Sequence, residues 1–191
     1  MTHPAFPHDA AAPVSALLQI ETALHAGGTD LSALDILVGR RLNLIGFCAM
    51  LKSLPAGGPG LTRRLAPALA AYLTCDFPAL IAEEEEGLLR FLNRRLLLGD
   101  DLDDVIRQLS DEHRQDCEQA RGLAARCRDF AAGTDQDWPD LCEALADFAE
   151  RQFRHLRWED ATLLPVARER LSAGDLDLWR AEMDRRHHFT T

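Results

Sequence analysis

The sequence predicts an all-α protein: an up-down-up-down four-helix bundle with short extra helices at the N- and C-terminal ends. Three observations predict this class. Apolar residues recur at helical spacing in four long stretches. Short segments rich in glycine, proline or aspartate separate these stretches. β-Branched residues, which favour strands, are few. Long amphipathic helices joined by short loops pack as antiparallel neighbours, so a bundle is the expected architecture.

The N-terminal end is predicted to lie apart from the bundle. Residues 1–13 contain three prolines and should form a flexible segment, whereas residues 14–191 should form a single domain. Residues 14–25 are predicted to form a short leading helix, because two consecutive glycines follow at positions 27 and 28.

The first bundle helix carries an arginine among its inward positions. Thr29 or Asp30 can cap this helix, which we expect to end at Leu54 before the proline- and glycine-rich residues 55–60. Its apolar stripe consists of leucines, isoleucine, valine and cysteine, except that Arg41 stands in the middle of it. An inward guanidinium needs a negative partner in the core.

The second bundle helix carries a run of four glutamates. It is predicted over residues 62–98, with kinks near Pro67 and Pro78 and a stop at Gly99. The run Glu83-Glu84-Glu85-Glu86 crosses the face that must be buried. If the helix is continuous, at least one of these carboxylates points into the core.

Two further long helices complete the predicted bundle. Asp100 is the expected cap of the third helix, at residues 102–132. After the loop at 133–139, the fourth helix should continue to Leu171. A closing helix over residues 175–186 follows a Ser-Ala-Gly-Asp turn that can cap it.

The charge, apolar runs and cysteine spacing of the sequence exclude several classes of function. The net charge of −10 argues against nucleic-acid binding, which needs a concentrated basic face. No apolar run approaches 18 residues and no secretory signal precedes the domain, so we expect a soluble, cytoplasmic protein that does not bind a membrane. The five cysteines show no CxxC spacing, which favours reduced thiols over disulfides.

One short motif suggests metal chemistry. On a helix, His155 and Glu159 lie one turn apart on one face, with Asp160 at its edge. An imidazole and a carboxylate so placed can ligate one divalent cation. The alternative is an ordinary surface pair, since charged residues four apart are common on helices.

The residues around this pair carry a resemblance. The stretch His155-Leu-Arg-Trp-Glu-Asp-Ala-Thr-Leu-Leu-Pro165 resembles the last bundle helix of the hemerythrin-like (HHE cation-binding) family, in which His-x-x-x-Glu-Glu precedes Leu-Leu-Pro-x-Ala. The likeness extends in order from about Leu31 to Arg186. It implies a four-helix bundle around a non-haem di-iron site.

The resemblance also implies the ligand positions. Glu112-His113 matches the family's Glu-His on the third helix, with Cys117 one turn on. The candidate metal ligands are then His113, His155, Glu159, Asp160, Glu84, Glu85 and Cys117. Positions that hold histidine in relatives hold Arg41 (or the adjacent Arg40), Leu80 and Ile81 here.

These substitutions leave three interpretations of the centre. Two irons would lack ligands, so neither a di-iron site nor dioxygen carriage is expected. The first interpretation is a metal-free network in which Arg41 replaces the charge of the metal and binds the inward carboxylates, with the two histidines completing its hydrogen bonds. The second is a single iron or zinc ion. In the third, Arg41 extends out to solvent and nothing special fills the centre.

Two functions follow from these interpretations. If the centre is degenerate and metal-free, the protein is a non-enzymatic binding or regulatory module. Alternatively, it is a mononuclear iron or zinc protein in metal sensing, storage or redox protection. An enzyme is not favoured, because the sequence has no phosphate loop, zinc-protease motif or serine elbow. A homodimer or an unidentified protein partner is possible, and the sequence does not indicate a small-molecule ligand.

Overall fold

The computed structural model describes residues 31–97, 99, 101–134 and 136–188, and in this part of the chain all regular structure is helical. The elements are α2 (Ala33–Thr74), α3 (Asp76–Glu83), the π-helix η1 (Glu84–Leu89), α4 (Arg90–Asn93), α5 (Leu102–Ala132), α6 (Trp138–Arg170) and α7 (Ala173–His188). The predicted flexible segment, the leading helix, and the caps Thr29, Asp30 and Asp100 lie outside the described residues.

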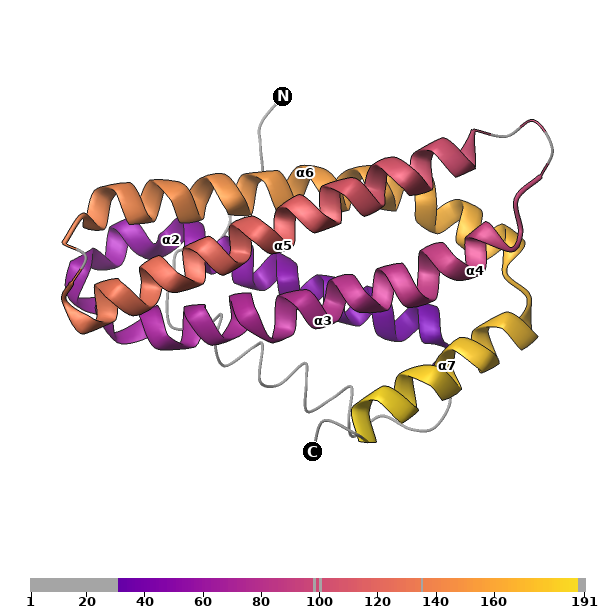
Figure 1. The fold of residues 1–191 in the computed structure, drawn as a ribbon, viewed down its shortest axis with the longest axis horizontal. Coiled ribbons are helices and arrows are strands. Elements are labelled where there is room, and N and C mark those ends of the chain that lie inside the picture. The colour runs from indigo at the N-terminus through magenta and orange to yellow at the C-terminus, as the bar shows by residue number, and fades with distance from the viewer. Residues whose placement is uncertain (1–30, 98, 100, 135, 189–191) are drawn as a thin grey trace, which may run out of the picture.

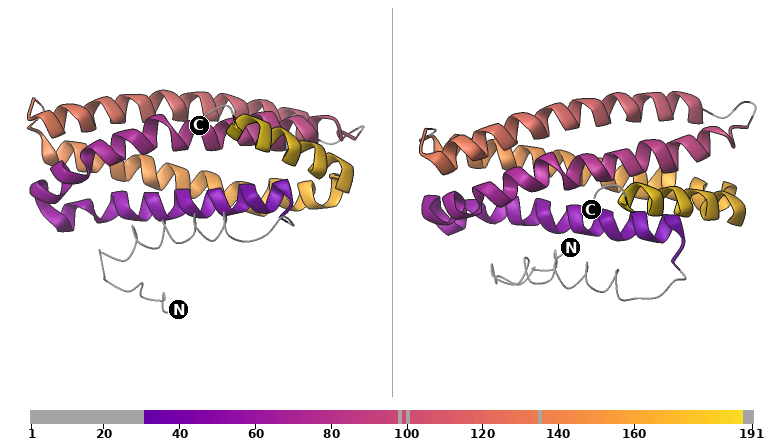
Figure 2. Two further views of the ribbon diagram at one scale, coloured as in Figure 1. Left: turned by 90° about the horizontal axis from the view of Figure 1, so that it is seen from below. Right: turned by 60° about the horizontal axis from the view of Figure 1, so that its bottom comes forward.

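The fold is the predicted antiparallel bundle. The chain reverses inside α2, so the first arm of α2 is one bundle helix and its second arm continues through α3, η1 and α4 as the next. Helices α5 and α6 complete the bundle (Figure 1). Helix α7 follows α6, lies outside the four long helices, and crosses back over α2 and the η1–α4 end (Figure 2).

The reversal in α2 depends on one glycine. Gly58 has φ +73° and ψ 172°, and it is the only non-helical residue inside α2. The chain therefore breaks within the predicted residues 55–60, at Gly58, but the first arm runs past Leu54 and includes Pro55. Glycine adopts a positive φ without a Cβ clash, and Pro59 then starts the second arm with its fixed φ. The Thr62 hydroxyl donates to the Gly58 carbonyl (3.1 Å).

Ser32 caps the first bundle helix. The backbone N–H of Asp35 donates to Ser32 Oγ, and that of Ser32 donates to Asp35 Oδ2, both at 3.2 Å. This reciprocal capping box supplies acceptors for two N–H groups that have no partner inside the helix. The helix therefore begins after Ser32 and not after Thr29 or Asp30.

The second bundle helix breaks near Pro78 but not at Pro67. Pro78 has no N–H for the Thr74 carbonyl and its ring crowds that group, so α2 ends at Thr74 and Cys75 leaves ideal helical geometry (φ −118°). The last part, α4, ends at Asn93 and not at Leu98.

The later helices agree closely with the predicted bounds. Helix α5 matches residues 102–132, and Gly133, with φ +81°, terminates it. Helix α6 starts slightly earlier than expected, at Trp138. The predicted Ser-Ala-Gly-Asp turn caps α7 through paired hydrogen bonds between Ser172 and Asp175.

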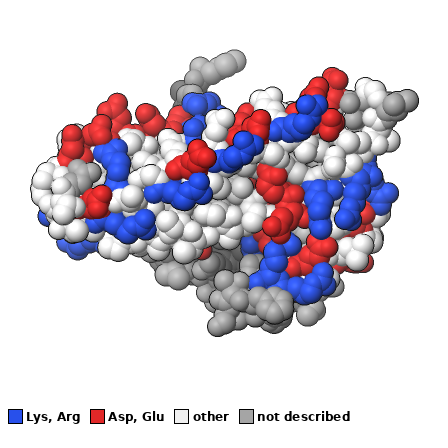
Figure 3. Space-filling view, viewed as in Figure 1, with Lys and Arg blue, Asp and Glu red and all other residues white. Residues whose placement is uncertain are grey.

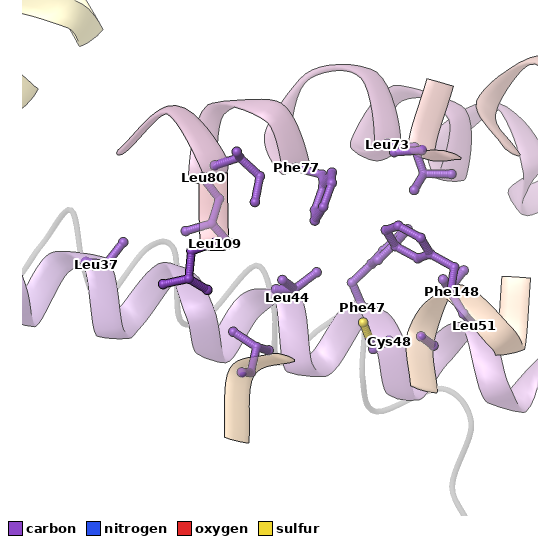
Figure 4. Close-up of a cluster of buried hydrophobic side chains, with 14 of the residues drawn as sticks. Leu37, Leu44, Phe47, Cys48, Leu51, Leu73, Phe77, Leu80, Leu109 and Phe148 are labelled. Atoms are coloured by element: carbon purple, nitrogen blue, oxygen red, sulfur yellow. The ribbon is translucent and has the colours of Figure 1, made fainter. Parts of the chain in front are cut away.

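Apolar side chains from all four bundle helices fill the interior. Figure 4 shows leucines and phenylalanines of the two arms of α2, α3, α5 and α6 meeting in one cluster. The Phe77 and Phe148 rings meet edge to face with centroids 5.3 Å apart. The outer surface carries acidic and basic side chains interspersed, as on the face shown in Figure 3. The predictions that the chain binds neither nucleic acid nor membrane remain predictions.

One helical stretch, Ala33–Asn93, is long and apolar enough by composition alone to cross a membrane. This signal is weak, because core helices of soluble bundles have the same composition. The stretch also folds back on itself at Gly58 and contributes two arms to the bundle core.

The contact between η1 and α7 gives a first testable prediction. A Cβ added to Gly87 would lie 2.0 Å from Nε1 of the buried Trp179 indole. Gly87→Ala should therefore lower the free energy of unfolding by about 1–3 kcal/mol, the usual cost of overpacking, in a urea titration.

Gly122→Ala is the matched control. Gly122 lies in exposed mid-helix of α5 with open space around it, so alanine should raise stability by roughly 0.5–1 kcal/mol. Equal effects of the two changes would contradict the tight contact between Gly87 and Trp179.

Candidate metal centre

Five polar side chains meet in the middle of the bundle. The first arm of α2 supplies Arg41, η1 supplies Glu84, α5 supplies His113, and α6 supplies His155 and Glu159. All five are buried: Arg41 is 3% exposed, Glu159 0% and His155 9%. Charged groups so far from water need partners, and here they supply them to one another.

Arg41 binds one side of the carboxylates. Its Nη1 donates to Glu84 Oε1 (2.9 Å) and Glu159 Oε2 (2.6 Å). Its Nη2 donates to Asp160 Oδ1 (2.9 Å) and to the Leu156 carbonyl (3.2 Å). The guanidinium is therefore held inside the bundle, which rules out the interpretation in which Arg41 extends to solvent.

The other oxygens of the same carboxylates face the two histidines. Glu84 Oε2 lies 3.5 Å from His113 Nε2, and Glu159 Oε1 lies 3.4 Å from His155 Nε2. The two Nε2 atoms are 3.2 Å apart. Glu159 Oε1 is buried and has no hydrogen-bond partner. The predicted network is thus present around Arg41, but the histidines do not bond to the arginine.

Carboxylates on the far side of the rings orient both histidines. His113 Nδ1 lies 2.5 Å from Glu85 Oε1. The other oxygen of Glu85, Oε2, accepts a hydrogen bond from the Ser110 hydroxyl. His155 Nδ1 lies 3.3 Å from Glu112 Oε2. If each Nδ1 carries the proton it shares with its carboxylate, both Nε2 lone pairs point at the same place. Two lone pairs 3.2 Å apart repel unless a cation or a proton lies between them.

The two central carboxylates titrate differently. Burial and the charge of Glu159 raise the pKa of Glu84 to about 7, against the opposing charges of Arg41 and the histidines. Burial also acts to raise the pKa of Glu159, but the His155 imidazole, whose Nε2 lies 3.4 Å from Oε1, and the charge of Arg41 outweigh it and lower that pKa. Glu159 is therefore the permanent anion of the centre.

The histidines gain affinity for protons. Burial alone would lower the pKa of His155, but the Glu159 carboxylate close to its Nε2, with its negative charge, raises that pKa to about 9. For His113, burial is likewise outweighed, by the hydrogen bond to Glu85 and the charge of Glu84, and the pKa is raised. At neutral pH the metal-free centre therefore holds a proton close to the two Nε2 atoms.

This predicts the pH dependence of the metal-free fold. His155 has an ordinary pKa of 6.5 and a folded pKa of about 9, so its stabilising contribution is complete below pH 6.5 and is lost as pH rises through 9. Unfolding free energies in the presence of a chelator should fall by up to about 3 kcal/mol between pH 6.5 and 9. His155→Gln should flatten this slope, and a flat wild-type profile would contradict it.

The residues fit one metal ion. Four ligands about 2.1 Å from a tetrahedral ion lie about 3.4 Å apart. The two Nε2 atoms are 3.2 Å apart, His113 Nε2 lies 3.5 Å from Glu84 Oε2, and His155 Nε2 lies 3.4 Å from Glu159 Oε1, whereas His113 Nε2 is 3.9 Å from Glu159 Oε1. One ligand atom from each of Glu84, His113, His155 and Glu159 lies within 4.8 Å of the others. Imidazole nitrogen with carboxylate oxygen suits zinc or ferrous iron. The guanidinium of Arg41 already occupies the opposite side of both carboxylates.

The structure separates the predicted site residues into two groups. Glu84, His113, His155 and Glu159 converge. Glu85 lies behind His113, Asp160 has a 53% exposed side chain and binds Arg41, and Cys117 is not among the converging groups. Leu80 and Ile81 are buried and apolar.

Sequence reasoning missed two features of the centre. The π-helical turn η1 was not predicted, although it carries Glu84, and such turns recur at functional sites. The role of Glu112 behind His155 was also missed, because these residues are 43 positions apart and meet only in the fold. The Glu112-His113 step had been noted, but it gives no indication of which histidine Glu112 contacts.

Solvent approaches the centre between α5 and α6. Two surface pockets, of about 100 and 460 Å³, share Glu112, His155 and Trp158 in their walls. Of the four converging residues, only His155 lines these pockets. The edge of its ring is therefore the part of the centre nearest to bulk water.

Comparison with known families agrees with this geometry. The hemerythrin HHE cation-binding domain model matches residues 36–167. The chain belongs to this family. No curated protein and no solved structure matches it. The matched region of this hemerythrin-like domain covers the four bundle helices and all the converging residues, whereas α7 lies beyond it.

Proposed function

We propose that this hemerythrin-like domain binds a single divalent transition-metal ion, zinc or ferrous iron, through Glu84, His113, His155 and Glu159. The observation that carries the proposal is the convergence of two Nε2 atoms and two carboxylate oxygens, one of them, Glu159 Oε1, buried without a hydrogen-bond partner. A bound ion would give this oxygen the positively charged partner that it lacks.

Arg41 limits the centre to one ion. Its guanidinium uses Glu84 Oε1 and Glu159 Oε2, the oxygens that a second ion would need. Four protein ligands also fill a tetrahedral coordination sphere and leave no open position, as in structural zinc sites. We therefore assign the domain a non-enzymatic role in metal sensing or regulation and not dioxygen carriage.

The test is metal content per chain. Tagless protein purified without chelators, and offered zinc or anaerobic ferrous iron, should hold about one ion by inductively coupled plasma mass spectrometry. Two ions would contradict the role of Arg41. A value near zero with a fully helical circular dichroism spectrum would leave the second candidate, a metal-free arginine network, which the four hydrogen bonds of Arg41 favour.

Ion binding should compete with protons. The pKa of His155 is about 9 in the metal-free centre, so an ion must displace a proton near neutral pH. Zinc affinity should then rise steadily from pH 6.5 to 9. Calorimetric titration in buffers of different ionisation enthalpy should detect more than one released proton per zinc at pH 7, because Glu84, with a pKa of about 7, also loses its proton.

A further inference from the structure

The π-helical turn that carries Glu84 has a second, outward face that contacts α7. Glu86 and Gly87 of η1, with Glu83 directly before it in α3 and Arg90 directly after it in α4, follow one another at helical spacing, and each contacts α7. Glu84 points the other way, into the metal centre. One short turn thus contacts both the centre and α7.

Glu83 depends on α7 for its counter-charge. Its carboxylate is buried, and Arg186 of α7 donates to both of its oxygens, Nη2 to Oε2 at 2.6 Å and Nε to Oε1 at 3.2 Å. Arg40 adds a longer contact of 3.7 Å. A buried carboxylate without a cation is costly, so the conformation of the turn depends on the docking of α7.

Close side-chain packing also joins η1 to α7. The Trp179 indole of α7 is fully buried against Gly87, with no room for even a Cβ between them. Glu182 of α7 also pairs with Arg90 at the end of η1. Helix α7 can therefore dock only when this turn keeps its present form.

The two charge pairs are adjacent in both elements. Arg41 binds Glu84 in the centre, and the preceding residues Arg40 and Glu83 form the outward pair that Arg186 completes. Any rotation of the turn that frees Glu83 also moves Glu84 away from the other ligands. Packed elements of this kind shift as units and do not deform continuously.

We propose that docking of α7 and binding of the metal ion are thermodynamically linked, with Glu83 and Arg186 as the positioning pair that holds Glu84 in the centre. The link rests on the proposed function, because it concerns the same ion. Ion binding stabilises docked α7, and the metal-free protein releases α7 more readily. Arg186 pairs with Glu83 and Glu86, which are not among the four proposed ligands, and acts through Glu83 and the turn.

The first test compares two neighbouring arginines in the full chain. Arg186→Ala should weaken zinc binding up to about tenfold by calorimetric titration, the lower end of the cost of removing a direct partner of a ligand, because Arg186 acts one residue further away. Arg185→Ala removes the same charge from an exposed position one residue away and should change the zinc Kd less than about twofold. Glu83→Gln, which keeps the size of the side chain, should weaken binding in the same direction as Arg186→Ala.

The second test measures the effect of zinc binding on the docking of α7. Zinc should slow hydrogen exchange of the α7 amides in the wild type, and it should do so much less in Arg186→Ala, because coupling between two sites is reciprocal. Leu145→Ala controls for general loss of stability: this buried residue of α6 lies ten positions, about 15 Å of helix, from His155. It should leave the zinc Kd unchanged.

The outcomes separate the two proposals. The link is overturned if the zinc Kd of Arg186→Ala is unchanged, or if zinc does not alter hydrogen exchange of the α7 amides. The proposed metal site would remain valid in either case. Equal weakening by Leu145→Ala and Arg186→Ala also overturns the link, because the effect would then be one of general stability. A wild-type protein that takes up neither zinc nor ferrous iron overturns the proposed function, and the link falls with it.

Discussion

Replacing Arg41 with methionine should lower the free energy of unfolding of the metal-free protein by about 3–5 kcal/mol, the usual cost of removing one partner from a buried ion pair. Glu84 and Glu159 would stay buried, without the guanidinium that binds both. The measurement is a urea titration in the presence of a chelator. The loss should be larger at pH 8 than at pH 6, because Glu84, with a pKa of about 7, can protonate at the lower pH.

Two comparisons make this result specific. Arg107→Met removes an arginine whose pairs with Asp103 and Asp104 lie on the exposed surface of α5, and it should have little effect. Zinc should restore part of the stability lost in Arg41→Met, since an ion that binds the folded state stabilises it. Unchanged stability of the Arg41 variant would mean that the carboxylates are neutral or hydrated, contrary to the observed network.

Replacing His155 with alanine should reduce metal content from about one ion per chain to nearly none, with an affinity loss of at least about a hundredfold. The change removes a ligand nitrogen 3.4 Å from Glu159 Oε1 and leaves the other imidazole alone in the centre. Removing an outer partner already costs ten- to hundredfold, and a direct ligand should cost more. Metal content by mass spectrometry and a zinc titration both measure it.

The control for His155 is its neighbour on the same helix. Trp158 lines the same pockets but offers no ligand atom, so Trp158→Ala should keep one ion per chain. If His155→Ala retained its ion, the metal would be held elsewhere and the four-residue centre would be wrong. The circular dichroism of both variants should remain helical, since neither change breaks a helix.

Much of the bundle was predictable because it depends on local signals. Apolar residues at helical spacing marked the inward face of each helix, and they placed Arg41, His113, His155 and Glu159 in the interior. The glycine at 133 and the serine at 172 ended and began helices where expected. The predicted bounds were less accurate near prolines: a helix tolerates Pro55 and Pro67, and the chain reverses where Gly58, within the predicted proline- and glycine-rich break, adopts a positive φ.

The choice among the glutamates could not be predicted in this way. Glu83, Glu84, Glu85 and Glu86 are chemically identical, and a regular α-helical periodicity does not account for the π-helical turn that distributes them. The structure directs Glu84 to the centre, Glu85 to His113, and Glu83 to Arg186. Long-range packing decides each direction, through α2 for Glu84, α5 for Glu85 and α7 for Glu83.

By itself, the sequence determined the helices, the inward faces and the family to which they belong, because these follow from residue spacing and from motifs read along one chain. Only the tertiary structure decided that Arg41 binds one side of the two carboxylates while both histidines face the other. The physical reason is that atoms of residues as far apart as Arg41 and Glu159 share one buried space. Their charges must balance there, and no local pattern records which of them meet.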